Sequence, residues 1–188
     1  RGYCRYESKN FNEAIKDFDE AIQQDPKLAL AFFHRGDAKF STDNIAGAIQ
    51  DYAQAMALGV TDPVLFNNRG KAYYKQENYP LAIADFRSAI DKKPDYAKAY
   101  ENRGLAYFNS KKYEEAAKDF REVEKLSAKP DADLLRMLGD TYYYLGKFPL
   151  AREYYDKVIE SGAKDKEVFY KRGLMQLEEG EYQGALSD

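Results

Sequence analysis

The sequence predicts an all-α fold, a solenoid of stacked antiparallel helix–turn–helix repeats. The first observation behind this prediction is a regular spacing of glycines, which lie 34, 34, 34, 35 and 34 residues apart. They are Gly2, Gly36, Gly70, Gly104, Gly139 and Gly173. A fixed period in this range is typical of arrays in which each unit stacks on the next and no unit folds alone. The second observation is that apolar residues recur at helical spacing in two runs within each period.

Residues 63–96 show how one unit is built. Asp62 precedes a proline, which pairs a good N-cap with a good first helical residue. The helical pattern breaks at Glu77 and Asn78, and asparagine tolerates the left-handed conformation that ends helices. A second helical pattern follows and stops at Pro94. Each unit is therefore predicted to be a hairpin of two helices of about three turns each.

Small residues recur where the two helices of a unit would touch. Gly70 and Ala82 are nearly equidistant from the turn. We therefore expect them to face each other across the hairpin, where small side chains let two backbones approach closely. An alanine column and a column of large aromatic residues repeat along the chain. The columns are Ala14, Ala48, Ala82, Ala116, Ala151 and Ala185, and Phe18, Tyr52, Phe86, Phe120 and Tyr155.

Taken in order, the chain contains four whole units between two incomplete ones. The incomplete units are 1–28 and 166–188, and the whole units are 29–62, 63–96, 97–131 and 132–165. Gly59 and Gly162 stand at the ends of units, where each is predicted to supply a left-handed helix cap. We expect a single continuous array without an internal domain boundary. Because both ends fall inside a repeat, we also expect the chain to be an excerpt of a longer protein.

At these positions the chain resembles the tetratricopeptide repeat family, whose unit is a helix–turn–helix of about 34 residues. In the unit 63–96 the matching residues are Phe66, Gly70, Tyr73, Tyr79, Ala82, Phe86, Ala89 and Pro94. The resemblance covers the whole chain, although the family's usual tryptophan is replaced by Phe32, Phe66, Tyr100, Leu135 and Phe169. It implies a right-handed superhelical solenoid in which the first helix of each repeat lines a concave groove.

A pair of opposite charges also recurs with the period. Arginine precedes the glycine in five of the six units, and an aspartate follows that arginine by sixteen residues each time. The pairs are Arg1 and Asp17, Arg35 and Asp51, Arg69 and Asp85, Arg103 and Asp119, and Arg172 and Asp188. The remaining unit has Leu138 and Tyr154 instead, so both charges are present together or absent together. We expect a partly buried Arg–Asp pair inside each regular hairpin; a pair of solvated charges is the alternative.

The resemblance places the candidate binding residues on the first helix of each unit. In related proteins, asparagines in the place of Asn68 and Asn102 hydrogen-bond the backbone of an extended peptide, since an amide both donates and accepts. An aromatic column would supply anchors. The groove candidates are His34, Asp37, Phe40, Asn67, Asn68, Lys71, Tyr74, Glu101, Asn102, Phe108, Arg136, Asp140 and Tyr143. The alternative is that these residue types belong to the repeat pattern and bind nothing.

Several classes of function are not expected. The 29 basic and 32 acidic residues give a net charge of -3, without a broad basic face for nucleic acid. One histidine and one cysteine provide no metal site, and no phosphate loop, nucleophile elbow or acid–base pair points to catalysis or a cofactor. No apolar run approaches the roughly 18 residues of a membrane span. The sequence does not indicate a compartment.

The leading hypothesis is a non-catalytic scaffold or adaptor that binds a peptide or protein segment in the concave groove. One alternative is a regulatory or substrate-recruiting arm of a larger enzyme, and another is an assembly scaffold that associates with itself end to end. Some family members grip a C-terminal carboxylate with lysines, asparagines and an arginine spread over three units. This chain lacks the full set, so a receptor for chaperone tails is not expected.

Overall fold

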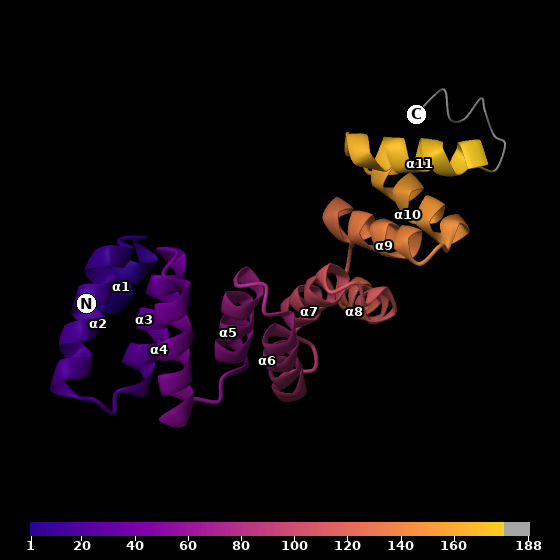
Figure 1. The fold of residues 1–188 in the computed structure, drawn as a ribbon. Coiled ribbons are helices and arrows are strands. Elements are labelled where there is room, and N and C mark those ends of the chain that lie inside the picture. Colours follow the sequence, from indigo (N-terminus) through magenta and orange to yellow (C-terminus); the bar gives the residue numbers. More distant parts are fainter. Residues whose placement is uncertain (179–188) are drawn as a thin grey trace. The chain divides into compact units, whose positions relative to one another are not determined.

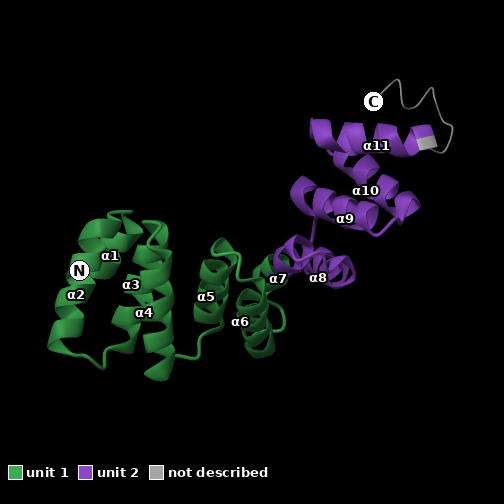
Figure 2. Ribbon diagram, viewed as in Figure 1, with its two compact units in different colours: residues 1–102 green, residues 103–188 purple. Residues whose placement is uncertain are grey.

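The structure, a computed structural model, describes residues 1–178, and over this range the chain is α-helical throughout with no β-strand (Figure 1). The helices are α1 (Gly2–Glu7), α2 (Phe11–Gln24), α3 (Ala29–Ser41), α4 (Ile45–Ala57), α5 (Pro63–Lys75), α6 (Tyr79–Lys92), α7 (Ala97–Asn109), α8 (Tyr113–Leu126), α9 (Ala132–Tyr144), α10 (Phe148–Glu160) and α11 (Lys166–Glu178). The chain divides into two compact units, residues 1–102 and residues 103–188 (Figure 2). Of the residues named above, Ala185 and Asp188 lie outside the described range.

Short polar side chains start several of the helices. Asp62, directly before Pro63 at the start of α5, accepts a hydrogen bond from the backbone N–H of Val64 at 2.7 Å, as the sequence predicts. Asn78 accepts from the backbone N–H of Leu81 and so caps α6. These side chains satisfy backbone donors that have no partner inside the helix.

The turn inside the hairpin 63–96 differs from the prediction by one residue. Glu77, and not Asn78, takes the left-handed conformation, with φ 57°. Asn78 keeps a negative φ of -82°, because its side chain is used to cap α6. The predicted left-handed caps at the unit ends are confirmed, with φ 95° at Gly59 and 83° at Gly162. The backbone therefore places its left-handed residue before the capping position, where the side chain projects into solvent.

The recurring glycines make room for the recurring aromatic residues. A methyl group added to Gly70 would lie 2.7 Å from Cε1 of Phe86, well inside van der Waals contact. The same relation holds for Gly2 and Phe18, Gly36 and Tyr52, Gly104 and Phe120, and Gly139 and Tyr155. The aromatic ring from the second helix therefore lies against the glycine. Ala82 is also fully buried, and the expectation that it faces Gly70 stays a prediction.

Each hairpin in residues 1–102 completes its core with the first helix of the next repeat. Leu65 and Ala72 of α5 join Ala48, Tyr52 and Ala55 of α4 in one buried cluster. One repeat further on, Ala89 and Ile90 of α6 pack with Ala99 of α7, and Phe66 and Tyr96 pack against them. In residues 103–178 the buried side chains of α8, α9, α10 and α11 follow the same columns, among them Phe120, Leu135, Tyr155 and Val168.

An arginine and an aspartate meet across the regular hairpins. Arg69 donates from Nε and Nη2 to the two carboxylate oxygens of Asp85, each at 2.7 Å. Arg35 contacts Asp51 at 2.8 and 2.6 Å, and Arg103 contacts Asp119 at 2.8 Å twice. The aspartate side chains are only 5–7% exposed and those of the arginines 15–18% exposed.

Desolvation works against these charges. Burial raises the pKa of the Asp119 carboxyl above its ordinary value, although the hydrogen bond from Arg103 lowers it. A buried ion pair of this kind contributes little net stability, but it makes each charge depend on its partner. The bidentate geometry of the arginine fork satisfies both carboxylate oxygens at once.

The hairpin 132–165 replaces the charges with an apolar and aromatic contact. Leu138 is fully buried, and Tyr154 stacks on Tyr142 with ring centroids 5.6 Å apart. The Tyr154 hydroxyl donates to Glu124 at 3.1 Å, so its polar end is satisfied. In the last repeat, Arg172 donates to Asp156 at 2.7 Å, whereas its predicted partner Asp188 lies outside the described residues.

Candidate functional site

A polar pocket of about 250 Å³ lies on the side of the unit 1–102 where the first helices of successive hairpins meet. It is lined by Tyr6, Asp37, Phe40, Ser41, Tyr52, Asn68 and Lys71, from α1, α3, α4 and α5. Four of these are groove candidates from the sequence: Asp37, Phe40, Asn68 and Lys71. We call this site the Lys71 pocket.

Asp37 is held by neighbouring side chains. It accepts hydrogen bonds from the Tyr52 hydroxyl at 2.8 Å and from Nδ2 of Asn68 at 2.9 Å, and both use its Oδ1 atom. The Asp37 side chain is only 12% exposed, so its main role is to position Tyr52 and Asn68, and little of its charge is accessible to a ligand. The hydrogen bond that Asn68 donates to Asp37 also holds the Asn68 amide in place. Among the residues that the structure describes, no donor reaches the Asn68 amide oxygen, which is therefore available to accept.

Lys71 carries a charge without a carboxylate partner. Its ammonium nitrogen lies 5.1 Å from the centroid of the Phe40 ring, and no acidic group of the described residues comes within ion-pair distance. Burial lowers the pKa of the Lys71 ammonium below its ordinary value. The charges of Lys98 and Lys75 lower this pKa further, and the charge of Asp37 raises it.

Two nearby lysines differ from Lys71. Lys75 pairs with Asp43 at 2.8 Å, and Lys98 pairs with Glu101 at 2.7 Å. Both of these pairs are exposed to solvent, where ion pairs contribute little. The half-buried Lys71 is thus the cation of this face whose charge has the most to gain from an added carboxylate.

Other groove candidates of this unit lie outside the Lys71 pocket. Asn67 is 3% exposed, and its amide oxygen accepts a hydrogen bond from Nδ2 of Asn102 at 2.8 Å. The expectation that Asn67 faces a ligand therefore needs correction, because it points between α5 and α7. His34 lies between the rings of Tyr3 and Phe33 and borders a different pocket.

The aromatic column of the first helices has a role inside the hairpin. Tyr74 contacts Tyr79, the first residue of the following helix, with ring centroids 5.7 Å apart. Corresponding contacts join Tyr6 to Phe11, Phe108 to Tyr113 and Tyr143 to Phe148. Since each ring closes the turn of its own hairpin, only its remaining surface is available for a ligand.

In the unit 103–178, Arg136 and Asp140 belong to one charge network. Asp140 accepts from the Tyr155 hydroxyl at 2.8 Å, from Lys171 at 2.7 Å and from Arg136 at 3.2 Å. The carboxylate is nearly buried and its charge is balanced by its neighbours. The Asp140 carboxylate is therefore already paired with cations of its own unit, whereas Lys71 has no carboxylate partner among the described residues.

The hydrogen bond between Tyr52 and Asp37 was not predicted, although a pattern in the sequence indicates it. Asp37 and Asp140 each follow the repeat glycine directly, and each accepts from a tyrosine fifteen residues later. The repeats with Tyr3, Lys71 or Leu105 after the glycine have phenylalanine at the aromatic position: Phe18, Phe86 and Phe120. In the residues described, a tyrosine therefore stands at the aromatic position where an aspartate can accept the hydrogen bond of its hydroxyl.

Replacing Tyr155 by phenylalanine is expected to lower the free energy of unfolding by about 1 kcal/mol, the usual net value of a hydrogen bond. The loss stays small because Asp140 retains Lys171 and Arg136. Urea denaturation followed by circular dichroism measures it. The matched control is Tyr113→Phe, whose ring contacts remain. An equal loss in both variants would show that the Asp140 contact is not responsible.

The repeated hairpin and its stacked cores define the class of protein, a helical-repeat solenoid. The sequence pattern of the tetratricopeptide repeat matches residues 67–133 and 136–188, and a second pattern, described as TPR repeat, matches residues 2–43. The chain belongs to the tetratricopeptide repeat family. This is generally a protein-interaction fold without catalytic activity, and the chain shares its repeat architecture.

Solved structures with the same fold support this assignment. MamA superposes with a TM-score of 0.79 at 21% identity, over 85% of this chain and 92% of that chain. YrrB, described as a TPR protein with an unusual peptide-binding site, gives 0.77 at 23% identity, over 85% and 81% of the two chains. The first TPR domain of Spaghetti (RPAP3), bound to the HSP90 peptide SRMEEVD, gives 0.60 at 30% identity, over 63% and 93%. A comparison with curated protein sequences gives no match.

Two further findings concern sites and membranes. Among residues 1–178, no group of three or more histidine, cysteine, aspartate or glutamate side chains is arranged to hold a metal ion. Within the same range, no helix combines the length and apolar character that crossing a bilayer requires.

Proposed function

We propose that the unit 1–102 binds an extended polypeptide segment across α3 and α5, with an acidic side chain of that segment paired with Lys71. The observation that carries this proposal is the half-buried Lys71 ammonium, which has no carboxylate partner among the described residues. A carboxylate placed in the Lys71 pocket forms an ion pair that the described part of the chain does not supply to Lys71. Partial burial makes such a pair stronger than one on an open surface.

The pocket also suits the backbone of a ligand. The Asn68 amide is fixed by Asp37, and its oxygen is available to accept from a peptide N–H. The Phe40 ring offers an apolar surface beside it. Two of the similar structures are described with peptide binding, and the peptide named with Spaghetti contains two glutamates and an aspartate. Both likenesses favour a peptide as the ligand, and the Spaghetti peptide favours an acidic one.

Substituting Lys71 by methionine is expected to weaken peptide binding by about 10- to 100-fold, the equivalent of the roughly 1.5–3 kcal/mol of a charged hydrogen bond. Methionine keeps the apolar stem on Phe40 and removes a partly desolvated charge, so the fold should be as stable or more stable. The loss of binding would therefore not reflect unfolding.

The experiment selects peptides from a random displayed library on the full chain and measures the affinity of the strongest binders. The matched control is Lys16→Met, which removes an exposed lysine of α2 that pairs with Glu13. The proposal expects selected peptides rich in aspartate or glutamate that lose affinity for Lys71→Met and keep it for Lys16→Met. Equal affinity for both variants, or no selected peptide at all, would overturn it.

A further inference from the structure

A small pocket of the unit 103–178, of about 210 Å³, is lined by residues of α8, of α9 and of the turn that leads into α10. The buried part of the lining consists of Ala117 and Tyr142, which are 7% and 6% exposed, and Leu145 lies beside them. The charged residues of the lining are all exposed to solvent; they are Glu114, Lys118, Arg121 and Lys147. We call this site the Ala117 pocket.

The alanine that gives the pocket its space distinguishes this hairpin from those before it. Ala117 directly follows the recurring alanine of the second helix, and the three preceding hairpins have Ile15, Ile49 and Ile83 at this place. Their longer side chain is used for packing, since Ile83 is only 9% exposed and Ile49 packs against the core cluster of its hairpin. Alanine is shorter, so it leaves open a space that isoleucine would fill.

Three cations line this space, and none of them has a carboxylate partner among the residues that the structure describes. Lys118 and Lys147 form no ion pair within residues 1–178, and the acidic residue of the lining, Glu114, pairs with neither. A hydrogen bond with the Tyr142 hydroxyl raises the pKa of the Arg121 guanidinium above its ordinary value. The lining therefore carries three positive charges and one negative charge.

One of these cations stands where other hairpins have a helix cap. Asn44 and Asn78 hold this place before α4 and α6, and each accepts a hydrogen bond from a backbone N–H of the helix that it begins. Lys147 makes no such bond before α10, because a lysine side chain has no acceptor. Its side chain lines the Ala117 pocket instead.

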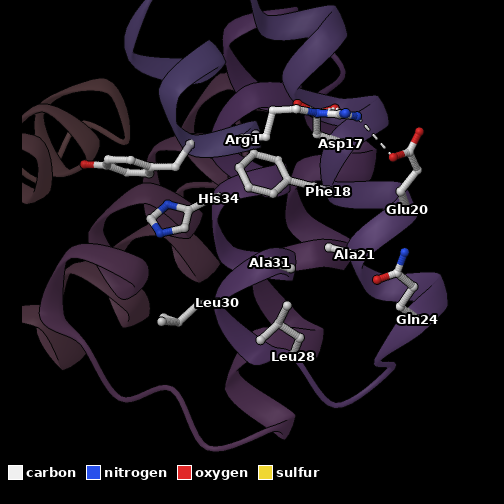
Figure 3. Close-up of a pocket in the computed structure, with 12 residues that line it drawn as sticks. Arg1, Asp17, Phe18, Glu20, Ala21, Gln24, Leu28, Leu30, Ala31 and His34 are labelled. Atoms are coloured by element: carbon white, nitrogen blue, oxygen red, sulfur yellow. Dashed lines mark hydrogen bonds and ion pairs between the residues drawn. The ribbon is translucent and has the colours of Figure 1, made fainter.

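The larger pocket of the unit 1–102 differs in its charges. Figure 3 shows this pocket between α1, α2 and α3, with Arg1 at its edge beside Asp17 and Glu20. Arg1 is paired with both of these carboxylates, so its charge is already balanced. Unpaired positive charge around a pocket is therefore not a general consequence of stacking these repeats.

We propose that the Ala117 pocket binds an aryl phosphate, the phosphorylated tyrosine side chain of a partner polypeptide. A phosphate monoester carries a charge of about -1.5 to -2 at pH 7 and three strong acceptor oxygens, which suits three cations better than a carboxylate does. Arg121 provides the planar fork that phosphate favours, and Lys118 and Lys147 add charge from α8 and from the turn. The phenyl ring occupies the space beside Ala117 and Leu145.

The first test titrates the full chain with phenyl phosphate while NMR records the methyl groups of Ala117 and Leu145. We expect saturable shifts of both groups, and an affinity at least about tenfold higher than that of inorganic phosphate, of O-phosphoserine or of benzoate. A glycine-flanked phosphotyrosine peptide should bind at least as tightly as phenyl phosphate. Equal affinity for inorganic phosphate would indicate an adventitious ion only. That result, equal affinity for benzoate or O-phosphoserine, or weaker binding of the peptide would overturn the proposal.

Variants that carry residues of other hairpins separate this pocket from a general attraction of anions. Ala117→Ile keeps every charge and fills the space, so it should abolish binding of phenyl phosphate. Lys147→Asn introduces a helix cap, so it should preserve the fold and weaken binding about tenfold. The matched control is Lys112→Asn, the same change at the same place before α8 and outside the lining, which should leave the affinity unchanged.

The outcomes of these variants decide the proposal. Unchanged affinity of folded Ala117→Ile, or equal losses in Lys147→Asn and Lys112→Asn, would overturn it. If thermal unfolding shows that Ala117→Ile does not fold, the comparison of the two Lys→Asn variants decides alone. Lys71→Met should bind phenyl phosphate as the unchanged chain does, so the Ala117 pocket and the Lys71 pocket can fail or hold independently.

Discussion

Replacing Asp85 by alanine is expected to lower the free energy of unfolding by about 3–5 kcal/mol. Arg69 loses both of its carboxylate contacts, each at 2.7 Å, and its guanidinium is left partly buried between α5 and α6. Taking one member from a buried pair removes the attraction and leaves the desolvation cost of the other charge. Urea denaturation followed by circular dichroism measures the loss.

The informative comparison is the double variant Arg69→Leu with Asp85→Tyr. The hairpin 132–165 holds Leu138 and Tyr154 in the same two places, both buried, so this fold accepts the replacement. We therefore expect the double variant to be more stable than Asp85→Ala, although it lacks both charges. If the single and double variants are equally destabilised, the Arg–Asp contact is a solvated pair and its burial has no energetic consequence.

Replacing Gly70 by alanine is expected to lower the free energy of unfolding by about 1–3 kcal/mol, the usual cost of overpacking. The sign is unusual, since alanine in a helix is ordinarily favoured over glycine by about 1 kcal/mol. The added methyl group would lie 2.7–2.8 Å from two carbons of the Phe86 ring, which is fully buried. Denaturant midpoints of the two proteins give the difference.

A second substitution locates the cause. Phe86→Leu removes the ring atoms that the new methyl group meets, so Gly70→Ala should cost clearly less in that background than alone. Residues in direct contact show such non-additivity, whereas independent sites add. Additive effects would mean that Gly70 is required for a reason other than the ring of Phe86.

The period of the sequence was enough to predict the architecture. Six glycines at a nearly constant spacing, with two helical runs between them, specify stacked hairpins, and the helix ends at Asp62, Gly59 and Gly162 follow from local chemistry. The description of the chain as one continuous array, with repeats at the stated boundaries, remains a prediction.

Contacts between side chains were harder to predict. Equal distance from the turn predicted that Ala82 faces Gly70, but it did not reveal that the ring of Phe86 lies directly against the glycine. Asn67 and Asn68 are neighbours in sequence, yet one is buried against α7 and the other lines a pocket, because adjacent residues of a helix point about 100° apart.

The candidate site could not be predicted from the residue types alone, because it depends on the surroundings of each lysine in the folded chain. Lys71, Lys75 and Lys98 are indistinguishable as residue types, and all three lie near one face of the unit 1–102. The folded chain gives Lys75 and Lys98 carboxylate partners, and it partly buries Lys71 with no such partner among residues 1–178. Lys98 finds Glu101 three residues further along the same helix, whereas the partner of Lys75 comes from the preceding repeat. The partial burial of Lys71 depends on how the repeats pack, which periodicity alone does not reveal.

The most direct test of this account is an NMR titration of the Lys71 side chain, free and with the strongest selected peptide. Burial and the neighbouring lysines should hold the pKa of free Lys71 below the ordinary value of about 10.4, and a bound carboxylate should raise it. Because the peptide then binds the charged ammonium better, its affinity should fall as the pH rises above the pKa that Lys71 has in the free protein. A Lys71 pKa that is the same with and without the peptide would contradict the proposed site.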